Sequence, residues 1–266
     1  MASNFILGIY NYCDYWCDRC AFTRRCRNFA MGEEICKSER RKTQSDEDNA
    51  RFGDSLEGTF ANAREQLDAL AKSRFSDDFL MGDFDEIDEY DFQSFMQREE
   101  TTRRAVHAHP LATIARTYCT EVAKWQEAAK QDIAASVKDI IARARFGIDT
   151  DTGTARKAFD ELEEMIEIVL WYHTLLPPKA CRYVDDIWRD RPASGNGGED
   201  TLGTAKLLLV SADRSISAWM HIREHLPSQE DSILRFLVLL DKFRRMIEKE
   251  TPSARTHIRP GLDEEH

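Results

Sequence analysis

The chain has 266 residues, a formal net charge of −11, a charged fraction of 32% and a mean hydropathy of −0.56. This composition is typical of a soluble, helix-rich protein, and its negative charge disfavours nonspecific binding to nucleic acid by the protein as a whole. No apolar run approaches the roughly 20 residues that a membrane-spanning helix needs, so no membrane insertion is expected. The apolar stretch at residues 5–10 is too short for a signal peptide and follows no basic segment. We therefore expect a cytoplasmic protein.

The first predicted element, residues 1–36, is a small module built around clustered cysteines. Cys13, Cys17, Cys20 and Cys26 fall within fourteen residues, separated by three, two and five others. Because disulfides rarely persist in a reducing cytoplasm, we expect these thiols to be available as thiolate ligands. Thiolates bind Zn²⁺ and iron–sulfur clusters, and both accept four cysteines. The sequence therefore predicts a four-cysteine metal site.

The spacing of these cysteines favours one of the two metals. Structural zinc sites usually combine two Cys-x2-Cys pairs that a longer loop separates, whereas this segment has one such pair, Cys17 and Cys20. A [4Fe-4S] cluster is larger than a single ion and is commonly held by one compact run of cysteines. We therefore expect a [4Fe-4S] cluster and keep Zn²⁺ as the alternative.

The segment from Cys17 to Phe29, with the pattern Cys17-x2-Cys20-x5-Cys26, resembles a known cluster-binding segment. Similar cysteines occur in [4Fe-4S] helicase-nucleases and Cas4-like nucleases, and at the end of the cluster loop of helix-hairpin-helix DNA glycosylases. The resemblance implies cluster ligation by these three cysteines, and Cys13 joins them by proximity. The sequence has neither a nuclease core of strands with acidic residues and Lys nor a Gly-rich helix-hairpin-helix turn, so nuclease activity is not inferred.

A second pattern, Cys13-x3-Cys17-x2-Cys20, matches the cysteines of radical-SAM enzymes. Those enzymes need a barrel of alternating strands and helices after the motif, whereas this sequence predicts helices alone. Cys26 would also occupy the iron that a radical-SAM cluster leaves open. We therefore disfavour this interpretation.

Basic residues flank the cysteines. Between Arg19 and Lys42 the sequence has eight Lys or Arg and three acidic residues. This basic flank, defined by Arg19, Arg24, Arg25, Arg27, Arg40 and Arg41, is expected to contact an acidic protein or nucleic-acid partner, or to be neutralised by an acidic segment at residues 77–91 of the same chain. That segment lies within residues 37–108, which we expect to be a linker with one short helix around residues 60–70.

Residues 109–250 carry apolar side chains at helical spacing almost throughout. The first predicted helix begins near Pro110 and continues through Ile141, and a second carries Phe159 to His173 before Pro177 and Pro178 break or kink it. A third follows the Gly-rich residues 193–198, and a fourth begins with Ser228 as its N-cap. The predicted fold is all-α, an antiparallel four-helix bundle with the N-terminal cysteine module and an extended tail at residues 251–266.

Two groups on these helices support an alternative interpretation of the protein as a helical-bundle metalloenzyme or ribonuclease. Glu164, Glu167 and His173 share the second helix, but the Glu-x2-His pairs of di-iron bundles are absent from the sequence. His221 and His225, with Glu224 between them, match the His-x2-Glu-His pattern of zinc peptidases. Only 41 residues follow, which leaves little chain for the third ligand. Enzymatic activity therefore stays open at this point.

Overall fold

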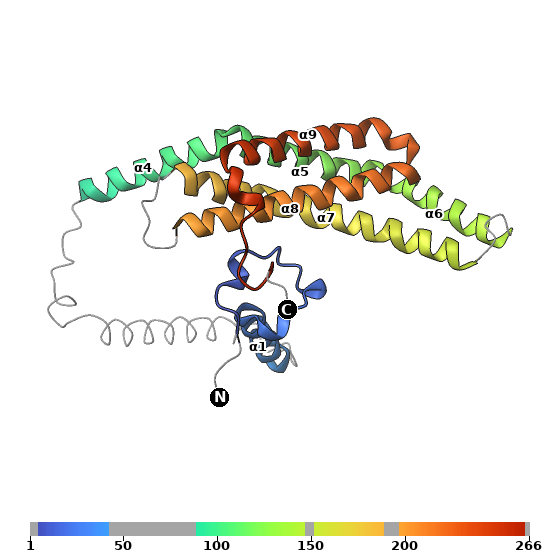
Figure 1. The fold of residues 1–266 in the computed structure, drawn as a ribbon, viewed down its shortest axis with the longest axis horizontal. Coiled ribbons are helices and arrows are strands. Elements are labelled where there is room, and N and C mark those ends of the chain that lie inside the picture. Colours follow the sequence, from blue (N-terminus) through green and yellow to red (C-terminus); the bar gives the residue numbers. More distant parts are fainter. Residues whose placement is uncertain (1–4, 43–88, 147–151, 189–196, 264–266) are drawn as a thin grey trace. The chain divides into compact units, whose positions relative to one another are not determined.

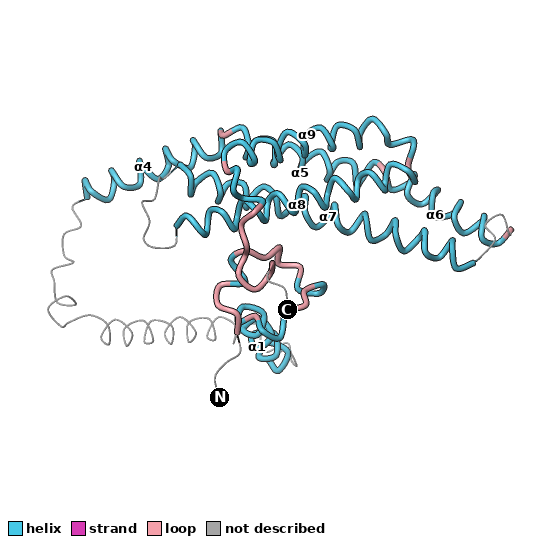
Figure 2. The backbone as a smooth tube through the Cα atoms, in the orientation of Figure 1, coloured by secondary structure: helices cyan, strands magenta, loops and turns pink. Residues whose placement is uncertain are grey.

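The computed structural model describes residues 5–42, 89–146, 152–188 and 197–263. Within these ranges every regular element is a helix and no strand occurs, as Figure 2 shows, so the protein is all-α as predicted. The longer helices are α1 (Arg27–Lys42), α4 (Glu89–Ala108), α5 (Pro110–Ala128), α6 (Lys130–Arg145), α7 (Thr152–Trp188), α8 (Gly197–His225) and α9 (Glu230–Glu250). Short 3₁₀ turns are η1 (Ile9–Asn11), η2 (Cys17–Arg19), η3 (Thr23–Arg25), η5 (Pro227–Gln229) and η6 (Pro252–Arg255).

The expected helix at residues 60–70 and most of the acidic segment lie outside the described residues. The chain divides into two compact units, one made of residues 1–21 and 101–266 and the other of residues 22–100. In the second unit η3 packs against α1. None of the described helices is both long and apolar enough to span a lipid bilayer.

In the first unit, helices α5 to α9 form what we call the helical body. As Figure 1 shows, α5 and α8 run in one direction and α7 and α9 in the other. Helix α7 contacts α5 and α8, helix α9 contacts the same two, and α6 extends beyond α5 along α7. Each of these helices therefore lies against neighbours that run antiparallel to it.

The core of the helical body is formed by the apolar stripes that the sequence predicts. Leu111, Tyr118, Val122 and Trp125 of α5 are buried, as are corresponding residues of the other helices, namely Leu162, Val169, Leu208, Trp219, Ile233, Leu240, Phe243 and Ile247. At the centre the Trp125 and Trp219 rings meet edge to face with centroids 4.7 Å apart. The buried Trp219 Nε1 donates a hydrogen bond of 2.9 Å to the Tyr118 hydroxyl, which satisfies both polar groups.

Several helices differ from the predicted ones. Helix α1 crosses the expected module boundary at residue 36, and α4 lies within the expected linker. The first predicted helix is divided at Ala129 into α5 and α6, although the chain stays helical on both sides. The apolar period continues across this point, so periodicity alone does not reveal the division. Ser228 is not the N-cap of the fourth helix, because η5 precedes α9 and the residue at the cap is Gln229. The Ser228 hydroxyl instead donates to Asp132 Oδ2 at 2.8 Å.

The prolines of the second predicted helix do not end it. Helix α7 runs for 37 residues with Pro177 and Pro178 inside it. Proline removes one intrahelical hydrogen bond, and the cost is lower where water can reach the carbonyl that loses its donor. Pro178 and Thr174, four residues earlier, are both exposed, whereas His173, four residues before Pro177, is buried. Of the predicted break or kink, the break does not occur, and solvent exposure accounts only for Pro178.

Candidate functional site

The described cysteine segment of the first unit, residues 5–21, contains two tight turns. Cys17 and Cys20 lie at the two ends of the turn η2, where the Cys20 N–H donates to the Cys17 carbonyl at 3.2 Å. Residues three apart in a 3₁₀ turn point to the same side, so the turn presents these two side chains together. Tyr15 precedes the turn with a φ of 58°, a left-handed conformation that is uncommon for a residue other than glycine.

Asp14, between the first two cysteines, attaches this segment to α7 and α8. Its Oδ2 accepts hydrogen bonds from the Tyr172 hydroxyl at 2.8 Å and from Arg214 Nη1 at 3.2 Å. Arg214 Nη1 also lies 2.6 Å from the Tyr172 hydroxyl, and the Asp14 carbonyl accepts from Trp171 Nε1 at 2.9 Å. Burial, followed by the negative charge of Asp14, raises the pKa of Tyr172 to about 12. Tyr172 is therefore held as a neutral hydrogen-bond donor.

Trp16 and Arg19 form a second attachment to α7. The Trp16 ring stacks on Trp171 with centroids 5.1 Å apart and an angle of 16° between the rings. The Arg19 guanidinium lies 4.3 Å from the centre of the Trp16 ring. Arg19 also pairs with Glu164 Oε1 at 3.0 Å and with Glu167 Oε2 at 2.6 Å. Stacking, cation–π attraction and two ion pairs thus act on one side of the segment.

The first suspected enzymatic group consists of Glu164, Glu167 and His173, and the contacts above place the two glutamates in a different environment from the histidine. Glu164 and Glu167 are exposed residues that pair with Arg19, whereas His173 is buried and its Nδ1 lies 2.7 Å from the Leu170 carbonyl of the same helix. Burial lowers the pKa of His173. Glu164 and Glu167 therefore share Arg19 as their partner, whereas His173 is bonded to the backbone of its own helix.

The second suspected group lies near the end of α8. His221 and Glu224 are exposed near the end of α8, and the His225 carbonyl accepts a hydrogen bond from the Ser136 hydroxyl at 3.1 Å. In the described residues, no three His, Cys, Asp or Glu side chains are gathered closely enough to hold a metal ion. Among the described residues, neither the histidine groups nor the four predicted cysteine ligands are therefore gathered around one point.

Lys179 of α7 lies beside Tyr15, which precedes the turn η2. Its Nζ is 4.5 Å from the centre of the Tyr15 ring, and the residue as a whole is 7% exposed. Burial, followed by the nearby Arg182, lowers the pKa of Lys179, while Cys13 and Asp200 oppose this shift. A buried cation thus lies against Tyr15 of the cysteine segment. The Cys13 thiol itself lies 3.6 Å from the Tyr10 carbonyl, to which it is a weak donor.

The end of the chain holds the same segment from its other side. Arg259 Nη1 donates to the Tyr12 carbonyl at 3.3 Å, and Asp263 binds both Arg259, at 2.8 Å, and Lys206 of α8, at 2.9 Å. Gly203 of α8 lies directly against the Tyr12 ring, so that a Cβ atom at this position would overlap the ring. Residues 12–19 are therefore attached to α7, α8 and the C-terminal residues.

The cysteines outside this segment lie in several elements. Cys26, in the second unit, follows η3 and donates its N–H to the Thr23 carbonyl at 3.2 Å, and Cys36 lies exposed on α1. Cys119 and Cys181 are half-buried on α5 and α7, and burial raises the pKa of Cys119. None of the seven cysteines, all of which are described, forms a disulfide. Sequence reasoning selected the cysteines but missed the residues between them that attach the segment.

Comparison with known proteins gives no assignment, since no family model, curated protein or solved structure matches this chain.

Proposed function

We propose that this protein binds a metal centre, a [4Fe-4S] cluster, through Cys13, Cys17, Cys20 and Cys26. In this proposal helices α5, α7, α8 and α9 form an antiparallel four-helix bundle that carries the N-terminal cysteine module. The cluster serves as a structural or redox-responsive element of an interaction surface, in a cytoplasmic protein. Zn²⁺ held by the same four cysteines is the second candidate.

One observation carries the proposal: within residues 13–20, the residues that attach the segment to the helices are different from the cysteines that would bind the metal. The side chains that attach the segment to α7 and α8 belong to Asp14, Trp16 and Arg19, which alternate with the cysteines. An anchored backbone lowers the entropy that is lost when several ligands are gathered on one metal. The turn η2 also presents Cys17 and Cys20 on one side, as a metal-binding pair requires.

The chemistry of the surroundings is consistent with an anionic centre. Four thiolates carry a large negative charge even after a metal is bound, and a nearby cation offsets part of it. Lys179, whose Nζ lies 4.5 Å from the centre of the Tyr15 ring, would be such a cation. Together with Trp16 and Tyr15, it supplies apolar and cationic groups of the kind that tune a metal centre through its outer shell.

Metal analysis of the purified full-length protein tests the proposal. We expect anaerobically purified protein to be brown, with about four iron and four sulfide per chain as a [4Fe-4S] cluster requires. Single Cys→Ser variants at 17, 20 and 26 should lose most of the iron, since each removes one ligand. The matched controls C119S and C181S change half-buried cysteines of the helical body and should keep it.

The possible outcomes distinguish a bound [4Fe-4S] cluster, bound Zn²⁺ and no bound metal. If the protein is colourless and contains stoichiometric zinc, and the same cysteine variants lose that zinc, the metal bound by the four cysteines is Zn²⁺ and not a [4Fe-4S] cluster. Protein that contains neither metal above the level of a variant lacking all four cysteines would overturn the proposal. Loss of metal in the two controls as well would mean that the effect comes from misfolding, which circular dichroism would show independently.

The interaction surface is proposed to include the basic flank, with a protein or nucleic-acid partner. Arg24, Arg25 and Arg27 flank Cys26 at the end of η3 and the start of α1. If these side chains contact phosphates, mobility shifts on single-stranded DNA or RNA should weaken as salt is raised. R24E/R27E should abolish such a shift, whereas the reversal R156E on α7 should leave it unchanged. No salt-sensitive shift at any protein concentration would exclude nucleic acid as the partner.

A further inference from the structure

The outward face of α9 combines apolar and charged residues in an ordered pattern. The inward face of this helix buries Ile233, Phe236, Leu240, Phe243 and Ile247 in the core. On the opposite face, residues spaced by three or four positions are all exposed. We call this row the outer stripe, and it consists of Asp231, Leu234, Val238, Lys242 and Arg245.

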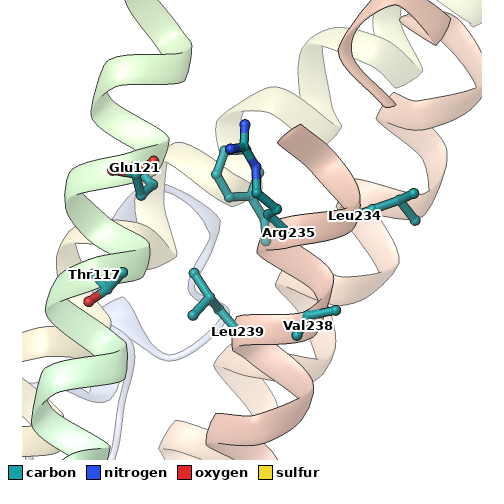
Figure 3. Close-up of a pocket in the computed structure, with 7 residues that line it drawn as sticks. Thr117, Glu121, Leu234, Arg235, Val238 and Leu239 are labelled. Atoms are coloured by element: carbon teal, nitrogen blue, oxygen red, sulfur yellow. The ribbon is translucent and has the colours of Figure 1, made fainter. Parts of the chain in front are cut away.

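The middle of the outer stripe is apolar. Leu234 is 41% exposed and Val238 is 52% exposed, and they border a groove of about 450 Å³ between α9 and α5. Figure 3 shows Arg235 and Leu239 on the side of α9 nearer to Thr117 and Glu121 of α5, while Leu234 and Val238 point away from α5. An apolar patch beside a groove with a polar rim is typical of a protein contact surface.

Within the outer stripe, the charges on the two sides of this apolar middle have opposite signs. Asp231 precedes it, and Lys242 and Arg245 follow it. This order is self-complementary, because two such helices that pack antiparallel place the acidic end of each against the basic end of the other. A second copy of this chain is therefore the partner that the surface fits best.

The spacing specifies the register of such a pair. If a two-fold axis passes by Val238, a residue a given number of positions before it faces the residue the same number after it in the second copy. Asp231 then faces Arg245, and Leu234 faces the aliphatic stem of Lys242. Two kinds of favourable contact therefore occur in one register, each of them twice.

Arg245 of the outer stripe has one ion pair within its own chain, in which its Nε lies 2.8 Å from Asp241 Oδ2 of the same helix. Asp241 also pairs with Arg244 at 2.8 Å, so it keeps a partner when Arg245 moves to a second copy. The Arg245 side chain is 74% exposed, so its pair is well solvated. Solvated ion pairs on one helix contribute little and exchange partners at low cost.

We propose that the outer stripe of α9 is the contact surface of a two-fold symmetric homodimer in which the two α9 helices pack antiparallel. Helix α9 has 21 residues, a length of about 30 Å, so the contact is small for a permanent dimer. The dimer is accordingly weak, in the micromolar range, and depends on salt because its outer contacts are charged.

Sedimentation velocity of the full-length protein at rising concentration tests this proposal. The wild type should change from monomer to dimer with concentration, and more readily at low salt. D231R places like charges together at two symmetric positions and should raise the dimer dissociation constant by about tenfold or more. The charge-swapped double variant D231R/R245D should restore most of the wild-type affinity, because each pair is reformed with its signs exchanged.

A matched control lies on α8, where Met220 is 44% exposed and lies outside the stripe. V238R should keep the protein monomeric, whereas M220R should dimerise like the wild type, and circular dichroism confirms that both are folded. A wild type that stays monomeric at several hundred micromolar would overturn the homodimer and leave the stripe to another partner. Dimerisation that D231R does not weaken, or that the double variant does not restore, would overturn the proposed register.

Discussion

Asp14 concentrates more of the attachment of the cysteine segment than any other single residue. Its carboxylate bridges Tyr172 and Arg214, and its carbonyl accepts from Trp171. Hydrogen bonds to an ionised group are stronger than neutral ones, and two of these donors come from side chains of α7. The position next to Cys13 therefore fixes where the first cysteine lies on the helical body.

Ionisation of the Tyr172 hydroxyl should lower the free energy of unfolding at high pH. Burial raises its pKa to about 12 in the folded state, above the ordinary value of 10.0. The unfolded chain then ionises first, so this contribution of about 2 kcal/mol is complete below pH 10 and is lost as the pH rises to about 12.

The variant Y172F tests this contribution. It should lower the free energy of unfolding at neutral pH by about 1 to 2 kcal/mol, because Asp14 and Arg214 lose a shared buried partner. It should also flatten the alkaline fall of stability, since one raised tyrosine is gone. Urea denaturation between neutral pH and the alkaline limit measures both effects. An unchanged alkaline slope in Y172F would contradict the assignment.

At the residue scale, sequence reasoning found the cysteines but not their neighbours' roles. Cysteine clustering is a local signal, readable from spacing alone. Asp14 meets Tyr172 across 158 positions of sequence, and Arg19 meets Glu164 across 145. An aspartate and an arginine between cysteines have no local pattern that distinguishes an anchor from a solvated charge. Their partners therefore had to come from the structure.

At the scale of elements, the replacement of Gly203 in α8 by alanine should have two opposing effects. Alanine in place of glycine inside a helix normally stabilises it by about 1 kcal/mol. At this position the new Cβ would overlap the Tyr12 ring, which is rigid and must move away as a whole. We expect G203A to keep or raise the stability of the helical body while it displaces the cysteine segment.

Hydrogen exchange separates these two effects. In G203A, amides of residues 9–20 should exchange about tenfold faster or more, while amides in the middle of α8 keep their protection. Y12A removes the ring and should make the further change G203A harmless or favourable. If G203A left the segment as protected as in the wild type, the ring would not be held against α8.

The Trp16 stack gives a second prediction for the same segment. W16A removes the contact with Trp171 and the surface over which Arg19 lies, so we expect a loss of about 1 to 3 kcal/mol in the local stability of residues 12–20. Trp188 at the end of α7 is 58% exposed, and W188A serves as the control. Limited proteolysis should cleave W16A within the segment first. Equal cleavage of W16A and W188A would contradict the stack.

The helices themselves were the most predictable elements, since apolar side chains at a spacing of three and four mark Leu111 to Trp125 and Ile233 to Ile247. The division at Ala129 was not predictable, because the apolar period continues through Ile133. The continuity of α7 through Pro177 was also not predictable, because propensity argues for a break and only tertiary packing overrides it.

At the scale of the whole molecule, the two ends of the chain are joined by one cluster of charges. Arg259 connects the Tyr12 carbonyl to Asp263, and Asp263 also binds Lys206 of α8. Burial alone would raise the pKa of Asp263, but hydrogen bonds from Arg259 and Lys206 outweigh it and hold that pKa well below its usual range. The ionised carboxylate is therefore the group that keeps this cluster together.

The last prediction concerns the loss of this cluster in acid. A carboxylate with a lowered pKa contributes stability that is present above its unfolded pKa of about 4 and is lost as the pH falls below it. D263N should remove about 1 to 2 kcal/mol at neutral pH and increase hydrogen exchange in residues 5–21, because Arg259 loses the partner that orients it toward Tyr12. D160N, which breaks only the exposed pair with Arg156 on α7, is the control and should change neither quantity. In the wild type the same residues should lose protection only as the pH approaches the acid range, and D263N should lack this further loss. If D263N and the wild type showed equal protection at neutral pH, the C-terminal residues would not hold the cysteine segment in place.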